Sequence, residues 1–323
     1  MMEDKKIYTS IRSQTAGKKI LLLGSSGNIG SKVLKILLDH GAPAAITAFD
    51  KNPPKEKNLP SQVTVLSGSQ ADITSADAVF AAVKGNDTIV CAIGVPRFTP
   101  PNEKKLTPFE IEENGMQHIV QAAKSIGGIN HIIYISALGV ARGDKIPSFH
   151  LNHLAKRNAE NILINSSITY TILRPSGYFF DFRDLIAAAI SDRYKIVDEG
   201  SAQVQPIHQD NIAEMLCASI GNESAKNKII AVGGPDVFSY RGLAEVFAKI
   251  LQKEVKPVSL NPAQFKKEYF NSDVVLFRAT SDSILAQGDL EKQKEVFPGL
   301  ELLRLADYLN NPDDPMLKAY FKK

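Results

Sequence analysis

The sequence has few cysteines, no tryptophan, little excess charge and no long apolar run, and each shortage excludes a class of protein. Cys91 and Cys217 are the only cysteines in 323 residues and lie far apart, so we expect no disulfide framework, no metal centre and a reducing, cytoplasmic setting. A net charge of +3 lacks the basic excess of nucleic-acid-binding proteins, so we expect no nucleic-acid partner. No run reaches the roughly 18 apolar residues that a membrane span needs, and residues 1–17 predict a polar N-terminal tail.

Short apolar runs alternate with helical patterns over most of the chain. The expected strands are residues 19–23, 44–49, 63–66, 88–92, 131–135, 169–173 and 228–232. Strands separated by helices are typical of a doubly wound parallel sheet. The sequence therefore predicts an α/β fold with a parallel sheet of about seven strands and a smaller C-terminal lobe.

A glycine-rich turn joins the first expected strand to the helix expected at residues 31–40. In such a turn Gly24 permits the tight bend, Gly27 lets the backbone approach a pyrophosphate, and Gly30 lets helix and strand pack closely. The free N–H groups and the helix dipole attract phosphates. The pattern predicts a dinucleotide-binding Rossmann domain, and the expected cofactor contacts here are Gly24, Ser26, Gly27, Asn28, Ile29 and Gly30.

The alternation of strands and helices places the domain boundary near residue 178. Residues 18–178 are expected to form the NAD(P)-binding Rossmann domain. Residues 179–323 are expected to form mainly a substrate lobe, with 203–213 and 228–238 returning to the Rossmann core. A small-molecule substrate is the expected second partner, and the sequence leaves the oligomeric state open.

The spacing G-x-x-G-x-x-G resembles that of the atypical and extended short-chain dehydrogenase/reductases, including the NmrA-like and divinyl-reductase-like branches. Further segments between about residues 18 and 237 resemble the family's landmarks in the family's order. For the cofactor, the resemblance implies contacts from Asp72, Ile73, Ala92, Ile93, Gly94, Pro175 and Gly177. It also implies an active-site serine at Ser136 and a substrate pocket that includes Tyr178, Phe179 and His208.

Several of these positions also have purely structural interpretations. Asp72 is equally consistent with a cap on the following helix, and Ser136 with a bond to the backbone. His208 and Asp210 are consistent with a turn in which Asp210 caps the helix that follows.

The choice between NAD and NADP depends on the end of the second expected strand. An acidic side chain there binds the adenosine ribose hydroxyls and repels a 2′-phosphate, whereas a cation attracts the phosphate. Asp50 stands at this position and Lys51 follows it directly. The sequence predicts NAD or NADP as cofactor and slightly favours NAD, because an unpaired carboxylate facing a phosphate costs more than a flexible exposed lysine returns.

The catalytic residues depart from the superfamily's usual pattern, a Tyr-x-x-x-Lys pair in which the lysine lowers the pKa of a proton-transferring tyrosine. Lys156 matches the lysine, but Asn152 stands where the tyrosine is expected. The candidate catalytic residues are therefore Lys156, Ser136 and Asn152. Two histidines, His150 and His153, are alternative proton donors, and Lys156 acting alone is another. Lys156 is equally consistent with a cofactor contact that anchors the nicotinamide ribose and transfers no proton.

These features favour an NAD(P)-dependent oxidoreductase that acts on an unidentified, apolar small molecule. A non-catalytic NAD(P)-binding sensor or assembly protein of the NmrA-like type is the main alternative, because the usual tyrosine is missing. An epimerase or lyase that uses bound NAD transiently is a third possibility.

Overall fold

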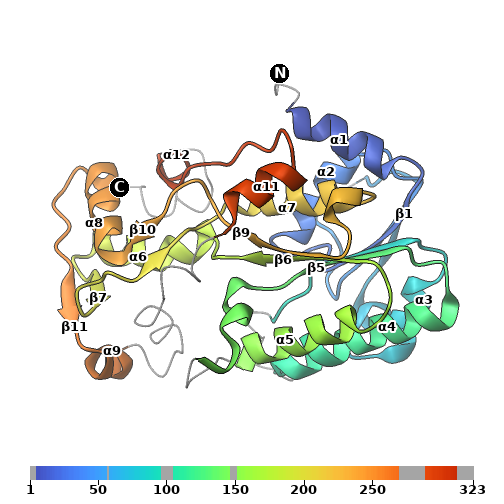
Figure 1. The fold of residues 1–323 in the computed structure, drawn as a ribbon, viewed down its shortest axis with the longest axis horizontal. Helices are drawn as coiled ribbons and strands as arrows, with labels where there is room; N and C mark the ends of the chain where they lie inside the picture. Colours follow the sequence, from blue (N-terminus) through green and yellow to red (C-terminus); the bar gives the residue numbers. More distant parts are fainter. Residues whose placement is uncertain (1–4, 57, 96–104, 146–150, 269–287, 311–323) are drawn as a thin grey trace.

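The computed structural model describes residues 5–56, 58–95, 105–145, 151–268 and 288–310, and its centre is one parallel sheet (Figure 1). The seven strands follow the spatial order β3-β2-β1-β4-β5-β6-β9, and every pair of neighbours is parallel. Their bounds are β1 (Lys19–Leu23), β2 (Ala45–Phe49), β3 (Val63–Leu66), β4 (Thr88–Cys91), β5 (His131–Ile135), β6 (Tyr170–Pro175) and β9 (Lys228–Val232). The predicted doubly wound sheet of seven strands is confirmed.

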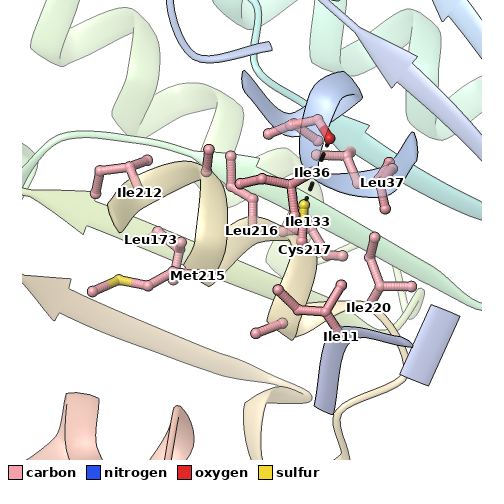
Figure 2. Close-up of a cluster of buried hydrophobic side chains, with 14 of the residues drawn as sticks. Ile11, Ile36, Leu37, Ile133, Leu173, Ile212, Met215, Leu216, Cys217 and Ile220 are labelled. Carbon is pink, nitrogen blue, oxygen red and sulfur yellow. Dashed lines mark hydrogen bonds between the residues drawn. The ribbon is translucent and has the colours of Figure 1, made fainter. Parts of the chain in front are cut away.

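Helices cover both faces of this sheet because its strands are apolar on both sides. Along β1, Ile20 and Leu22 belong to one buried cluster, and Leu21 and Leu23 belong to another on the opposite face. The first face carries α1 (Lys6–Thr15), α2 (Gly30–Asp39), α7 (Gln209–Ser219) and α11 (Leu290–Val296). The second carries α3 (Ala76–Val83), α4 (Asn114–Ile126) and α5 (Leu151–Ile164). Figure 2 shows the first cluster, where Ile11, Leu173 and Leu216 pack together.

The segment expected to be a polar N-terminal tail is instead the docked helix α1, so that prediction was wrong for residues 6–15. Ile7, Tyr8 and Ile11 are buried, and they lie on one stripe because residues four apart share a helix face. Tyr8 also donates a hydrogen bond to Glu214 on α7 at 3.0 Å. The average polarity of the segment concealed an amphipathic helix.

A smaller lobe lies beside the sheet and contains two short two-stranded sheets (Figure 1). Its elements are η4 (Phe179–Phe182), α6 (Arg183–Ile190), β7 (Lys195–Val197), β8 (Gln203–Val204), β10 (Phe238–Ser239), α8 (Tyr240–Leu251), β11 (Val258–Leu260), α9 (Pro262–Glu268) and α12 (Leu305–Leu309). Phe182, Tyr194 and Phe247 belong to its own buried cluster. The remaining short helical turns are η1 (Gly68–Ala71), η2 (Phe109–Glu113), η3 (Leu138–Lys145) and η5 (Glu223–Ala225).

The strand order reverses between β1 and β4, which lie side by side although two strands separate them in the chain. At such a switch point the loops after the two strands leave in opposite directions, and a crevice forms at their carboxyl ends. The glycine turn follows β1 and residues 92–95 follow β4, so both belong to this edge.

Candidate functional site

The glycine turn closes tightly against the loop after β4. Gly24 has φ +84°, and a Cβ there would lie 2.8 Å from the carbonyl oxygen of Ala92. A Cβ on Gly30 would lie 1.8 Å from the carbonyl oxygen of Gly24. Both positions therefore require glycine. Gly27 and Asn28 are exposed just before α2, and the start of a helix is a place where backbone N–H groups attract anions.

Asp50 at the end of β2 is held by two backbone N–H groups. Its Oδ2 accepts from Ser26 at 3.2 Å and its Oδ1 accepts from Asn52 at 3.1 Å. The carboxylate is therefore fixed beside the glycine turn, as expected for a group that meets an adenosine ribose. The ammonium of Lys51 lies 3.7 Å from the carboxylate of Asp72, which opposes its charge.

Asp72 does not cap α3, so that interpretation was wrong. Ser75 is the cap and accepts from the N–H of Ala78 at 3.3 Å. Asp72 instead accepts from the N–H and the hydroxyl of Thr74 at 2.9 and 2.7 Å. Burial favours the neutral acid, but the hydrogen bonds from Thr74 and the charge of Lys51 outweigh it and lower the pKa of Asp72.

The other positions matched to the adenosine end lie around Asp72 and the end of β4. The side chain of Ile73 is buried against α4, where a Cβ on Gly115 would lie 2.7 Å from its Cγ1. Ala92 and Ile93 are half-buried directly after β4, and Gly94 is exposed. The loop at 92–94 therefore borders the switch point, whereas Ile73 contributes packing.

Lys156 on α5 points at the carboxyl end of β5. Its ammonium donates to the carbonyl oxygen of Ile135 at 3.1 Å and lies 2.8 Å from Oε1 of Glu112. Ser136, which follows Ile135 in the chain, is only 3% exposed, and its hydroxyl has no hydrogen-bond partner in the part of the chain that the structure describes. Asn152, four residues before Lys156, is half-buried on the same face of α5. A buried lysine and an unpartnered hydroxyl thus meet at one strand end.

Sequence reasoning missed Glu112, the buried partner of Lys156. Glu112 also accepts from the hydroxyl of Tyr134 at 2.8 Å. Burial, reinforced by the charge of Glu112, raises the pKa of Tyr134 well above its usual value, so this hydroxyl remains a donor. Three acids, Glu110, Glu112 and Glu113, stand close together in the sequence, and no pattern there says which one is buried.

The segment after β6 runs beside residues 205–208. Gly177 has φ +149°, and its carbonyl oxygen accepts from the N–H of Ile207 at 2.8 Å. Pro175 ends β6 opposite Val232 of β9. Pro175 and Gly177, which the sequence analysis expected to contact the cofactor, therefore lie on the same edge of the sheet as Lys156, since β6 neighbours β5.

The three expected pocket residues differ in exposure. Phe179 is 1% exposed and its ring packs edge-on against His208 at 5.4 Å between centroids. His208 caps α7 by accepting from the N–H of Asp210 at 3.2 Å, and Asp210 itself pairs with Lys32. The interpretation of Asp210 as the cap was therefore wrong. Tyr178 is half-buried, so it is the most accessible of the three.

The structure also bears on the two histidines considered as proton donors, on membrane spans and on metal sites. His150 lies outside the described residues, and His153 is half-buried on α5. In the described ranges no helix is long and apolar enough to cross a membrane, and no three His, Cys, Asp or Glu side chains gather as a metal site would require.

The residues present fit a dinucleotide. The turn before α2 has no room for a Cβ at Gly24 or Gly30, and the buried hydroxyl of Ser136 has no hydrogen-bond partner among the described residues. A parallel sheet with such a turn at its switch point defines a dinucleotide-binding Rossmann protein, here of the atypical short-chain dehydrogenase/reductase type. Residues 24–223, more than half of the chain, match the NAD(P)H-binding family, and the chain belongs to this family.

Relatives and solved structures agree with this assignment. The chain is 25% identical over 227 residues to rice divinyl chlorophyllide a 8-vinyl-reductase, covering 67% of this chain but only 54% of that protein. It is 24% identical over 264 residues to the mitochondrial NADH dehydrogenase 1 alpha subcomplex subunit 9 of Arabidopsis thaliana, covering 78% of this chain and 62% of that one. An Escherichia coli NADPH-dependent quinone oxidoreductase in complex with NADPH shares the fold, with a TM-score of 0.69, 21% identity and coverage of 94% and 100%.

Proposed function

We propose that this protein is an NAD(P)-dependent oxidoreductase that reduces or oxidises an apolar small molecule. The carrying observation is Lys156, whose buried ammonium lies beside the unpartnered hydroxyl of Ser136 on the edge of the sheet that also bears the glycine turn. The names of the rice and E. coli relatives support a reductase. They lead us to test quinones and enones as substrates first.

The bound nicotinamide supplies hydride chemistry, and the residues of this chain supply binding and orientation. The turn at Gly24 and Gly30 holds the pyrophosphate against the start of α2. Lys156 and Ser136 offer N–H and O–H donors to ligand oxygens at the end of β5. Asn152 orients substrate or water without titrating, because an amide donates and accepts hydrogen bonds but does not exchange its charge near neutral pH.

For the cofactor we propose a preference for NAD over NADP. The carboxylate of Asp50 is fixed at the end of β2 by the N–H groups of Ser26 and Asn52. Lys51, the cation nearest in sequence, is opposed by Asp72. A 2′-phosphate in this place would meet a fixed negative charge and a partly neutralised positive one.

Turnover of NADH with a panel of quinones, enones and other carbonyl compounds tests the enzymatic proposal. We expect Lys156→Ala to lower kcat/KM by about 100-fold, the scale of one proton-transferring or orienting group. Lys124→Ala, an exposed lysine on α4, is the matched control and should turn over like the wild type. Gly27→Asp should abolish dinucleotide binding, because it adds a negative charge at the exposed turn.

A second candidate function is a non-catalytic NAD(P) sensor or assembly subunit. It is favoured by Asn152 at the position four residues before Lys156, and by the relative that is named as a subunit of an NADH dehydrogenase. If the wild type binds NADH tightly but oxidises it with no compound of the panel, the enzymatic proposal is wrong. A dinucleotide-dependent change in oligomeric state that Lys156→Ala leaves intact would then favour the sensor.

A further inference from the structure

Glu112 is a buried acid with partners on two other elements. It is 4% exposed at the end of the π-helical turn η2, whereas its neighbours Glu110 and Glu113 are only half-buried. A carboxylate removed from water is strongly destabilising unless charges and hydrogen bonds compensate it. The compensation comes from Lys156 on α5 and from Tyr134 on β5, each 2.8 Å away.

These contacts fix the orientation of the Lys156 ammonium. An ammonium has three N–H donors in tetrahedral arrangement. One N–H is donated to the carbonyl oxygen of Ile135 at 3.1 Å, and Nζ forms an ion pair with Oε1 of Glu112 at 2.8 Å. The Nζ atom also lies 5.2 Å from the centroid of the Tyr134 ring, which covers a further side. The ion pair and the hydrogen bond therefore hold the ammonium in place and leave N–H groups for a further acceptor.

The surroundings of Lys156 indicate which kind of ligand its remaining N–H groups bind. Ser136 follows Ile135 directly and is only 3% exposed. Its hydroxyl has no hydrogen-bond partner among the described residues. Gly94, exposed after β4, lies so close that a Cβ on it would be 3.7 Å from Oε1 of Glu112. A buried, unpartnered hydroxyl beside a fixed ammonium is suited to a ligand that presents oxygen acceptors.

We propose that Glu112 is the positioning residue of this site: its carboxylate fixes Lys156 so that the remaining N–H and the Ser136 hydroxyl bind oxygen atoms of one ligand. The ligand oxygen is a ribose hydroxyl at the nicotinamide end of the dinucleotide or an oxygen of the substrate. The inference rests on the proposed function, because it assumes that this edge of the sheet binds both. The Lys156 side chain is only 11% exposed, so we expect that without the charge of Glu112, its ion-pair partner in the described part of the chain, the ammonium turns toward water.

A double-mutant cycle on Glu112 and Lys156 tests the proposal. NADH affinity is measured by calorimetry, and kcat and KM are measured with a substrate found in the panel. We expect Glu112→Gln and Lys156→Ala each to lower NADH affinity or kcat/KM by about tenfold or more, as for the loss of one hydrogen bond to a charged group. The double variant should lose no more than Lys156→Ala alone, because Glu112 acts through Lys156.

Glu113→Gln is the matched control, since Glu113 lies on the same turn but accepts from Asn158 at 2.7 Å, whereas the ion pair with Lys156 belongs to Glu112. Because a change at a buried charge can unfold the chain, Glu112→Asp and Tyr134→Phe are measured in parallel with the melting temperature. Glu112→Asp keeps the charge and should recover part of the loss, and Tyr134→Phe should show a smaller loss in the same direction.

The outcomes separate the ligand sources and the two proposals. A loss in NADH affinity assigns the ligand oxygen to the dinucleotide, and a loss confined to kcat or KM assigns it to the substrate. If Glu112→Gln behaves like Glu113→Gln, or if the losses multiply in the double variant, Glu112 is not a positioning residue. Absence of wild-type turnover overturns the oxidoreductase alone, because the NADH-binding cycle still decides the role of Glu112.

Discussion

At the residue scale, Asp50 is the side chain that most directly tests cofactor choice. Its carboxylate is fixed by the N–H groups of Ser26 and Asn52, at the strand end where an adenosine ribose binds in this fold. We expect Asp50→Ala to weaken NADH binding about tenfold and to leave NADPH binding unchanged or stronger, since the substitution removes both an acceptor for the adenosine 2′-hydroxyl and a charge that repels the 2′-phosphate. Calorimetric titration with both dinucleotides measures the ratio.

Asp39→Ala, which removes an exposed acid paired with Lys35 at the other end of α2, is a suitable control for the change in net charge. A variant at Asp50 that weakens both dinucleotides equally would mean that Asp50 only supports the turn.

At the element scale, helix α1 is an integral part of the Rossmann core. Its residue Ile11 is fully buried and belongs to the cluster drawn in Figure 2, which also contains residues of α7. We expect Ile11→Ala to lower the free energy of unfolding by about 2–5 kcal/mol, because it leaves a cavity in a packed interior. Urea unfolding measures it, with the exposed neighbour Arg12→Ala as control. Equal effects of the two substitutions would show that α1 is not docked in solution.

At the scale of the whole molecule, the side chain of Asn211 joins the Rossmann body to the C-terminal segment. It is fully buried on α7, donates to the carbonyl oxygen of Glu301 at 2.8 Å and accepts from the N–H of Leu303 at 2.9 Å. It also donates to Glu214 at 2.9 Å, the same acid that Tyr8 and Lys5 of the N-terminal region bind. The two ends of the described chain are therefore held at one point on α7.

We expect Asn211→Ala to destabilise the protein by about 1–3 kcal/mol, because backbone groups of residues 301–303 lose their partners. Hydrogen exchange should also become faster in α12, which follows this segment. Asn165→Ala, at an exposed position after α5, is the control. Unchanged protection of α12 in Asn211→Ala would mean that its packing against the lobe suffices to hold it.

The sequence by itself determined the parallel sheet and the glycine turn that follows its first strand. Strand and helix periodicity can be read from neighbouring residues, and two requirements of the glycine turn are local as well: the positive φ of Gly24 and the close approach of Gly30 to the carbonyl oxygen of Gly24. The same local reasoning was wrong about residues 6–15, because the partner that makes α1 stable, α7, lies 200 residues away.

Only the tertiary structure decided the surroundings of Lys156. Glu112, Tyr134 and Lys156 come from three elements, and their ion pair and hydrogen bond exist only because η2, β5 and α5 pack together. Likewise, only the structure shows that Ser75 caps α3 and that His208 caps α7. Several side chains near a helix start can act as the cap, and the backbone conformation there decides which of them reaches the free N–H groups. Burial and pairing of polar groups are long-range properties, so no spacing in the sequence encodes them.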